Sequence, residues 1–584
     1  MSAPDAKNPL IVQSDHTILV EVDNPRYGEA RDRLVRFAEL VKSPEHIHTY
    51  RLTPLSIWNA CAAGLTATLI TDSLTGLAKY SVPEHVLVSV RDFASRYGRV
   101  QVTRGERGLV LSTNDLPLAE EIARQKTVAP FLRERFEPRR FLVDPGDRGR
   151  LKLALIKIGF PAEDLAGYAT GDDFPIELRL ITRAGRPFVV RHYQDEAARV
   201  FHAGGTERGG SGVVVLPCGG GKTIVAIACM ALVKSSTLIL VTSVTAARQW
   251  IEELLDKTTI PQDMIGEYCG ASKEVRSVTL ATYQMMTHRS SHDAEFTHLK
   301  LFDQRNWGLI IYDEVHLLPA PVFQITSTLQ ARRRLGLTAT LVREDGREDD
   351  VFALIGPKKV DIPWKDMEAE GWIAKARCTE IRLPMSEARR FEYAVAPNRL
   401  KFRVASENPG KLKVVRRLLK RHADTPTLII GMYVEQIKQM AEELKIPILT
   451  GSTPQRTRDG VYAEFKAGRL RQLVVSKIAN FSVDLPDAGV AIQISGTFGS
   501  RQEEAQRLGR VLRPKPGENQ AHFYSIVSRD TVEQEFAMNR QLFLCEQGYE
   551  YAIWNLESAD AELPQERECG LASPSPLPKG RGLG

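Results

Sequence analysis

Cysteine is scarce in this 584-residue sequence, and the seven cysteines are scattered with no C-x-x-C spacing. This absence argues against a zinc ribbon, an iron–sulfur cluster or a disulfide framework. Free, dispersed cysteines are typical of a reducing compartment. We therefore expect a cytoplasmic protein, associated with the nucleoid if the source is bacterial.

Long hydrophobic runs are also missing. The longest apolar stretch, residues 213–233, is interrupted by Lys222 and by several glycines, which excludes a membrane span there. The first residues, MSAPDAKNPLIVQSD, have neither a basic start nor an apolar core, so we expect no signal peptide. A membrane partner is not expected.

No excess of one charge dominates the chain. The formal net charge is +6, from 78 basic and 72 acidic residues, and 43% of the residues are hydrophobic. This balance permits a polyanionic partner without demanding one. The composition is that of an ordinary globular protein, long enough for about three or four domains.

The most informative stretch is SGVVVLPCGGGKTIVAIACMALV, residues 211–233. Its β-branched start predicts a buried strand, and its glycines and Lys-Thr precede an apolar helix. This is the pattern of a loop that wraps phosphates at a helix start, with Lys222 on the β- and γ-phosphates and the Thr223 hydroxyl on magnesium. A glycine-rich turn with a chance Lys-Thr is the alternative on this motif alone. The loop departs from the strict pattern by having Leu where Gly is usual, and its members are Leu216, Pro217, Cys218, Gly219, Gly220, Gly221, Lys222 and Thr223.

Two acidic residues follow a second apolar strand, in NWGLIIYDEVHLLPA. Ligand-binding groups lie at the carboxyl ends of strands in doubly wound sheets. Asp313 would hold Mg²⁺, and Glu314 would orient and deprotonate a water molecule. We expect His316 to form a hydrogen bond with a neighbouring motif, LGLTATLVRED, in which Thr338 and Thr340 are the candidate partners.

A further stretch, EEAQRLGRVLRPK, puts Gln506, Arg510 and Arg513 on one helical face. Arginines presented by a second domain suit a sensor that reaches the γ-phosphate when two lobes close around ATP. Upstream of the phosphate loop, Arg191 could stack on adenine and Gln194 could read its edge.

Together these motifs resemble those of superfamily 2 helicases and, more closely, the XPB family of DNA repair and transcription helicases. The matching stretches are LPCGGGKT, DEVH, LGLTATLVRED, DLPDAGVAIQIS, QEEAQRLGRVLRPK, FYSIVSRDTVEQEF and QGYEY, and the family shares Leu at position 216. The resemblance implies an α/β fold with two RecA-like, doubly wound parallel-sheet lobes and small α+β N-terminal domains. It implies ATP and Mg²⁺ as cofactors, single-stranded, forked or damaged duplex DNA as the partner, translocation on DNA and, in active members, 3′-to-5′ unwinding.

The resemblance also assigns residues. It assigns Asp484 to nucleotide binding and matches Arg343-Glu344-Asp345 to the family's RED loop. Roles in nucleic-acid binding or coupling fall by resemblance on His316, Thr338, Thr340, Arg343, Glu344, Asp345, Thr282, Ser476 and Lys477.

We expect six regions along the chain. They are a winged-helix-like module (1–130), a damage-recognition-like domain (131–185), an ATP-binding lobe 1 (186–365), a linker with a short thumb-like insertion (366–410), a lobe 2 (411–555) and a disordered tail (556–584). Two strands joined at Ala184-Gly185 are expected in FPIELRLITRAGRPFVV. The 1–130 module serves either core packing and partner docking or direct DNA contact. The basic cluster near Arg133 is either a nucleic-acid surface or a solvated face.

The favoured function is an ATP-dependent repair helicase, working as a monomer, with a partner nuclease or repair protein possible. One alternative is a duplex translocase that separates no strands, such as a restriction motor subunit. Another is an ATP-switched DNA-binding scaffold with little turnover. RNA as the track is a further alternative, because grips on the backbone tolerate both polymers.

Overall fold

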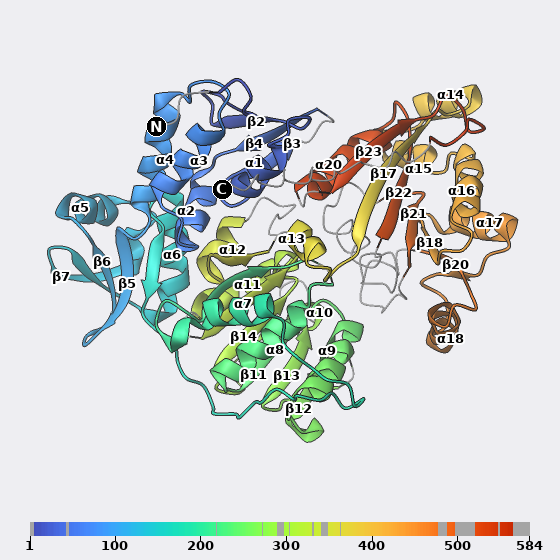
Figure 1. The fold of residues 1–584 in the computed structure, drawn as a ribbon. Coiled ribbons are helices and arrows are strands. Elements are labelled where there is room, and N and C mark those ends of the chain that lie inside the picture. The colour runs from blue at the N-terminus through green and yellow to red at the C-terminus, as the bar shows by residue number, and fades with distance from the viewer. Residues whose placement is uncertain are drawn as a thin grey trace, which may run out of the picture.

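The computed structural model describes residues 5–42, 46–217, 219–270, 272–288, 297–302, 304–329, 332–339, 348–362, 364–476, 488–496, 520–546 and 549–564. Two parallel sheets form the main bodies of the molecule, and two smaller antiparallel or mixed sheets precede them in the chain (Figure 1). No helix within the described ranges is both long and apolar enough to cross a membrane.

The first unit is a four-stranded antiparallel sheet covered by helices, with strand order β1-β2-β4-β3. Its hydrophobic core joins the sheet to the helices through residues such as Tyr50, Ile57 and Leu74. The elements are β1 (Leu10–Val12), β2 (Thr17–Glu21), α1 (Tyr27–Leu34), β3 (Glu39–Lys42), β4 (Ile47–Arg51), α2 (Pro54–Ala62), α3 (Ala67–Leu77) and α4 (Glu84–Arg96).

The second unit is a five-stranded sheet of order β7-β8-β6-β5-β9. Its elements are β5 (Val100–Gly105), β6 (Gly108–Thr113), α5 (Leu116–Arg124), η1 (Ala129–Phe131), β7 (Leu132–Glu137), β8 (Arg140–Val143), η2 (Pro145–Asp147), α6 (Arg148–Lys157) and β9 (Ala162–Leu165).

This second sheet corrects the predicted boundary at residue 130. The β5–β6 hairpin, expected as the wing of the first module, pairs instead with β8 and β9 of the following segment. The prediction of a winged-helix-like module over residues 1–130 was therefore wrong in including this hairpin, which belongs to the second sheet. Alternation identifies a strand but not its partner, and the buried face of this hairpin packs on α6 in a core of its own.

The two strands expected in residues 174–190 do not form. The only pairing within the segment is an isolated bridge between Ile181 and Pro187 among the described residues. The backbone of Arg179 bonds instead to Lys257 at the end of a lobe 1 helix. Ile176 is buried in the lobe 1 core, but Leu180 is 84% exposed and Val189 79%, so only the first part of the segment has a face to bury.

Lobe 1 is a seven-stranded, all-parallel sheet of order β12-β13-β11-β14-β15-β10-β16. Val214 of β10 joins the core on one face, and Val213 and Val215 join the core on the other, as expected of a strand buried on both sides. The elements are α7 (His192–His202), η3 (Ala203–Gly205), β10 (Ser211–Val215), α8 (Lys222–Val233), β11 (Thr237–Val241), α9 (Val244–Lys257), η4 (Gln262–Met264), β12 (Ile265–Tyr268), β13 (Val278–Thr282), α10 (Tyr283–Met286), η5 (Thr297–Phe302), β14 (Leu309–Asp313), η6 (Val315–Leu317), α11 (Ala320–Thr328), β15 (Arg333–Thr338), α12 (Glu348–Leu354), β16 (Lys358–Asp361) and α13 (Trp364–Ala369).

Lobe 2 is a second seven-stranded parallel sheet, of order β19-β20-β18-β21-β22-β17-β23. The elements are β17 (Lys375–Leu383), α14 (Glu387–Val395), α15 (Asn398–Ser406), α16 (Gly410–Arg421), β18 (Thr427–Ile430), α17 (Val434–Leu444), β19 (Ile448–Leu449), α18 (Gln455–Lys466), β20 (Gln472–Val475), β21 (Val490–Gln493), β22 (Gln520–Ser528), α20 (Val532–Glu546) and β23 (Glu550–Asn555). The two parallel sheets confirm the predicted fold class.

Two predicted limits of lobe 2 were wrong. Strand β17 lies inside the sheet between β22 and β23, so the lobe begins before residue 411 and the segment 366–410 is not only a linker. The predicted tail also starts too early. Leu556 is buried, and the Arg421 guanidinium on α16 donates to the carbonyls of Leu563 and Pro564. Residues 565–584 lie outside the described part of the chain.

The first unit touches both lobes. Trp58 of α2 is buried in a lobe 1 core cluster, and the Lys358 backbone amide at the sheet edge donates to Asn59 Oδ1 at 3.0 Å. On the lobe 2 side, Tyr551 packs against the core of this unit, and α20 contacts β3. The N-terminal unit therefore spans the two lobes (Figure 1).

Candidate functional site

The phosphate loop lies between β10 and α8 as predicted. Gly221 at the helix N-cap has φ of 81°, a left-handed conformation suited to glycine. A Cβ on Gly221 would lie 2.3 Å from Gln194 Nε2, so the position also lacks room for a side chain. Lys222 is then the first residue of a twelve-residue helix that begins directly at the loop. Cys218 lies outside the described residues.

Lys222 meets the acidic pair at the end of β14. Its Nζ lies 2.7 Å from Glu314 Oε1, and both side chains are largely buried, at 12% and 16% exposure. Strand β15 lies between β10 and β14 in the sheet, and all three strands are parallel, which brings the three motifs to one edge. The structure thus joins Lys222, Asp313 and Glu314, as the sequence predicts.

The two carboxyl groups have different electrostatic surroundings. Burial and then the Glu314 charge raise the pKa of Asp313 to about 6, against the opposing influence of Lys222. Burial also raises the pKa of Glu314, but Lys222 and then His316 overcome this effect and leave that pKa below its ordinary value. A carboxyl pair with divergent pKa values beside a lysine is typical of a functional site.

Glu314 has a strained backbone, with φ of 49° and ψ of 55°. A non-glycine residue in this left-handed region costs about 1–3 kcal/mol and persists where the surroundings enforce it. The consequence here is that the chain turns sharply after Asp313, whose Oδ1 accepts the Glu314 amide at 3.1 Å. The strain therefore falls at the residue predicted to activate water.

Sequence reasoning missed Trp250 on α9. Its indole Nε1 donates to Asp313 Oδ2 at 2.9 Å, and the side chain is almost fully buried. The Tyr283 hydroxyl donates to the Asp313 carbonyl at 2.8 Å. These bonds fix Asp313 from two other elements. In the sequence Trp250 is one more apolar residue on an amphipathic helix, and no local signal sets it apart.

The predicted adenine contacts lie beside the phosphate loop. Gln194 is buried, its Nε2 donating to the Gly220 carbonyl at 3.2 Å and its Oε1 accepting the Arg191 amide. The Arg191 guanidinium lies over the Trp372 ring, 4.3 Å from its centroid. The Tyr193 hydroxyl donates to the Gly220 carbonyl at 2.8 Å. Tyr193 and Trp372 were missed, although Tyr193 stands in the same RHYQ run.

The contact predicted between the DEVH run and the next motif is confirmed. His316 Nδ1 and Thr338 Oγ1 are hydrogen-bonded at 2.7 Å, and both residues are buried. The same ring nitrogen lies 3.6 Å from Glu314 Oε2. A chain of contacts therefore links Lys222, Glu314, His316 and Thr338 across neighbouring strands.

Other predicted residues are placed without a test of their roles. Thr282 ends β13 and caps α10 by accepting the Met285 amide at 3.2 Å, and Ser476 is buried just after β20. Their roles toward nucleic acid stay predictions. The remaining predicted residues lie outside the described part of the chain, and these are Thr340, Arg343, Glu344, Asp345, Lys477, Asp484, Gln506, Arg510 and Arg513.

The thumb-like insertion is a helical hairpin of α14 and α15. Phe391 is 71% exposed, but Phe402 is buried against Phe536 of α20, with ring centroids 5.2 Å apart. The Tyr393 hydroxyl accepts the Val532 amide, so this ring is tied to the lobe. Phe402 is therefore a packing residue, and Phe391 is exposed on the hairpin.

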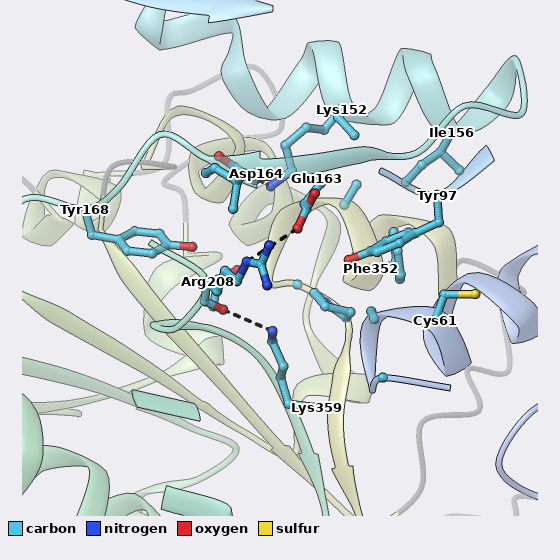
Figure 2. A pocket seen from close by; sticks show the side chains of 18 residues that line it. Cys61, Tyr97, Lys152, Ile156, Glu163, Asp164, Tyr168, Arg208, Phe352 and Lys359 are labelled. Carbon is cyan, nitrogen blue, oxygen red and sulfur yellow. Dashed lines mark hydrogen bonds and ion pairs between the residues drawn. The ribbon is translucent and has the colours of Figure 1, made fainter. Parts of the chain in front are cut away.

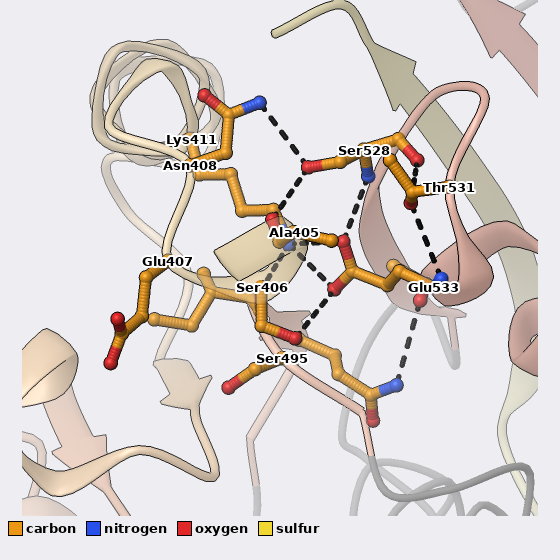
Figure 3. Close-up of polar contacts among 12 residues, drawn as sticks. Ala405, Ser406, Glu407, Asn408, Lys411, Ser495, Ser528, Thr531 and Glu533 are labelled. Atoms are coloured by element: carbon orange, nitrogen blue, oxygen red, sulfur yellow. Dashed lines mark hydrogen bonds and ion pairs between the residues drawn. The ribbon is translucent and has the colours of Figure 1, made fainter. Parts of the chain in front are cut away.

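A buried ion pair between α16 and α20 of lobe 2 lies against the end of this hairpin (Figure 3). Lys411 Nζ lies 2.7 Å from Glu533 Oε1, both side chains are 1% exposed, and the ammonium also donates to the Ile494 carbonyl. Glu533 accepts the Ser406 hydroxyl at the end of α15 and the Ser528 amide at the end of β22. This network, which the sequence did not suggest, fixes the start of α20 and the end of β21 to the hairpin.

The donors at the site fit magnesium better than a protein-only metal cage. No group of three or more His, Cys, Asp or Glu side chains with metal-binding geometry exists among the described residues. Magnesium is usually held by one or two carboxylates together with substrate phosphates and water. Asp313, a buried carboxyl beside the phosphate loop, and the Thr223 hydroxyl are the matching groups.

Comparisons with known proteins agree with this geometry. The model described as ERCC3/RAD25/XPB C-terminal helicase matches residues 367–568, and the model described as Type III restriction enzyme, res subunit, matches residues 187–343. A model described as Helicase conserved C-terminal domain matches residues 10–137.

Similar full-length proteins are known from several organisms. A Kineococcus radiotolerans protein named DNA 3′-5′ helicase XPB is 53% identical over 557 residues, covering 95% of this chain and 98% of that protein. A Mycobacterium tuberculosis protein of the same name is 52% identical, covering 93% and 97%. A protein of Enterocytozoon bieneusi, named General transcription and DNA repair factor IIH helicase/translocase subunit XPB, is 32% identical, covering 93% and 92%.

Proposed function

The chain belongs to the XPB helicase family, and we propose that it is an ATP-dependent DNA helicase that moves 3′ to 5′ and acts in DNA repair. The observation that carries the proposal is the contact between Lys222 and Glu314 at 2.7 Å beside the buried Asp313. These are the groups that phosphoryl transfer to water requires, gathered at one sheet edge.

The ion pair suggests how nucleotide binding prepares the site. Phosphate oxygens of ATP would compete with Glu314 for the Lys222 ammonium. Once Lys222 turns to the phosphates, Glu314 is released to orient a water molecule for attack. Thr223 and Asp313 would hold Mg²⁺, which supplies positive charge at the β- and γ-phosphates.

The contact between His316 and Thr338 offers a route from hydrolysis to motion. His316 contacts both Glu314 and Thr338, which ends β15. A movement of the Glu314 side chain would therefore be transmitted through His316 to Thr338. Arg510 and Arg513 would complete the site from lobe 2 on closure. Adenine recognition by Arg191 and Gln194 belongs to the same proposal.

The names of the eukaryotic relatives include DNA repair, which supports a repair role for this chain. We infer that it grips DNA mainly through the backbone, with little sequence preference. We further infer that it acts as a monomer in the cytoplasm, at the nucleoid if bacterial, with a nuclease or another repair protein as partner.

The test is steady-state ATP hydrolysis with and without single-stranded, forked and duplex DNA, and with RNA. Lys222→Ala should abolish stimulated hydrolysis, whereas Lys234→Asn, at the other end of α8, should retain it. Stimulation by DNA without unwinding would favour the duplex translocase. If DNA does not stimulate hydrolysis, the ATP-switched scaffold becomes the favoured function. If RNA stimulates hydrolysis as strongly as DNA does, RNA must be included as a polymer along which the protein moves.

A further inference from the structure

A cavity of about 240 Å³ lies where the first unit, the second sheet and lobe 1 meet (Figure 2). Ser211, at the start of β10, lines it, whereas the phosphate loop follows the other end of that strand. The cavity is therefore at the opposite edge of the sheet from the ATP site. Its polar lining comes from all three parts, with Tyr97 before β5, Glu163 on β9, and Arg208 and Lys359 in lobe 1.

Lys359 brings a half-buried ammonium to this cavity. Within the described residues its one hydrogen bond goes from Nζ to the Arg208 carbonyl, at 3.1 Å. An ammonium has three N–H donors, so two remain for another acceptor. Burial lowers the pKa of Lys359, as expected for a cation with too little compensating charge nearby.

The carboxylates of the cavity are already engaged by protein groups. Asp164 lies 2.5 Å from the Arg148 guanidinium and 3.0 Å from Lys152 Nζ. Glu163 accepts from Gln101 Nε2 at 3.0 Å through one oxygen and faces Arg208 Nε at 4.0 Å through the other.

The charges around the cavity are thus unequal. Three cationic side chains, Lys152, Arg208 and Lys359, line the cavity beside two carboxylates, Glu163 and Asp164. Arg148, which is not part of the lining, also binds Asp164, so the carboxylates do not balance the cations of the cavity.

Tyr97 adds a neutral donor. Its hydroxyl points toward the middle of the cavity (Figure 2), and it makes no hydrogen bond within the described part of the chain. Burial, and then the Glu163 charge, raise the pKa of this hydroxyl, so it keeps its proton at neutral pH. An O–H donor therefore faces the same space as the Lys359 ammonium and the Arg208 guanidinium.

We propose that this cavity binds a small phosphate-type oxyanion through Lys359, Arg208 and Tyr97. A dianion supplies the missing negative charge and accepts from several donors at once, and charge-assisted bonds of this kind are the strong ones. The ligand would contact Tyr97, at the junction of the first unit and the second sheet, together with Arg208 and Lys359 of lobe 1, and so would strengthen the docking of these parts. A free phosphate and the terminal phosphate of a DNA strand share this chemistry, and the small volume of the cavity, about 240 Å³, favours the free anion.

The test is equilibrium dialysis of full-length protein against radiolabelled inorganic phosphate at constant ionic strength. Lys222→Ala serves as the parent, because it removes the phosphate-binding lysine of the ATP site. The parent should retain about one phosphate per chain. Adding Lys359→Met should weaken binding at least about tenfold, as loss of a charge-assisted contact predicts, and adding Lys413→Met, a surface lysine of lobe 2, should not.

A second variant guards against misfolding. Tyr97→Phe removes only the hydroxyl and should weaken phosphate binding about threefold to tenfold, as loss of one hydrogen bond predicts. The proposal is overturned if the parent retains no phosphate, or if Lys359→Met and Tyr97→Phe both bind as the parent does. Competition by an oligonucleotide with a 5′-phosphate, but not by one with a 5′-hydroxyl, would assign the cavity to DNA ends and overturn the free-anion proposal.

Discussion

Replacing Trp250 by Phe tests how the site controls the charge of Asp313. Phe keeps the buried ring but removes the Nε1 donor that lies 2.9 Å from Asp313 Oδ2. A hydrogen bond to a charged group contributes about 1.5–3 kcal/mol. Because one pKa unit corresponds to about 1.36 kcal/mol, the Asp313 pKa should rise by about one to two units.

The sign of the effect follows from the protonation state that magnesium requires. Asp313 must be ionised to hold Mg²⁺, so activity is present above its pKa, which is about 6, and falls as the pH drops through that value. A higher Asp313 pKa in Trp250→Phe therefore moves the loss of activity to higher pH. At pH 7 and limiting Mg²⁺, the ionised fraction and hence kcat/KM should fall about twofold to tenfold, and most of the loss should be recovered by pH 9.

The assay is the pH dependence of kcat/KM for ATP, which reports the free enzyme. Trp307→Phe is the matched control, because Trp307 is a buried lobe 1 tryptophan whose Nε1 donates to the Leu301 carbonyl. This control should lower the unfolding temperature but leave the acid limb in place. An acid limb for Trp250→Phe that coincides with the wild type would refute the reasoning.

Three further predictions concern coupling, stability and DNA grip. Thr338→Val removes the hydroxyl that is hydrogen-bonded to His316 at 2.7 Å. We expect basal ATP hydrolysis to stay within about threefold of wild type and its stimulation by DNA to fall about threefold to tenfold, because one hydrogen bond is lost. An unchanged ratio of DNA-stimulated to basal hydrolysis would argue against the coupling role. Lys411→Met leaves the Glu533 carboxylate buried and should lower the free energy of unfolding of lobe 2 by about 3–5 kcal/mol in urea titrations. The double variant Lys411→Met/Glu533→Leu should recover most of that loss, and failure to do so would mean that the pair has a different role. DNA affinity, measured by fluorescence anisotropy, should fall at least about 100-fold between 50 and 200 mM salt, and a flat salt dependence would contradict a backbone grip.

The parts of the site that could be predicted are local in sequence. Strand, glycine loop and helix follow one another through residues 211–233, and the carboxyl pair follows its strand directly at Asp313 and Glu314. Parallel strands bring such ends to one edge, so the meeting of Lys222 with Glu314 follows from the motifs and the fold class.

The parts that could not be predicted depend on contacts between distant segments. Trp250 reaches the site from α9 and Trp372 from the turn after α13, and the local sequence of each shows only apolar packing. The β5–β6 hairpin alternates in the same way whatever its partner, so its place beside β8 and β9 is decided by tertiary packing. Residues 174–190 show the reverse case, since Ile176 packs into the lobe 1 core while Leu180 and Val189 stay exposed, and the alternation produces no sheet.

The most direct test of the central claim is ATP-dependent unwinding of forks that carry either a 3′ or a 5′ single-stranded tail. We expect the wild-type protein to open the 3′-tailed substrate and to leave the 5′-tailed one closed, and we expect Glu314→Gln to open neither while still binding ATP. Unwinding that persists in Glu314→Gln, or that favours the 5′ tail, would contradict an ATP-hydrolysing 3′-to-5′ helicase built on this site.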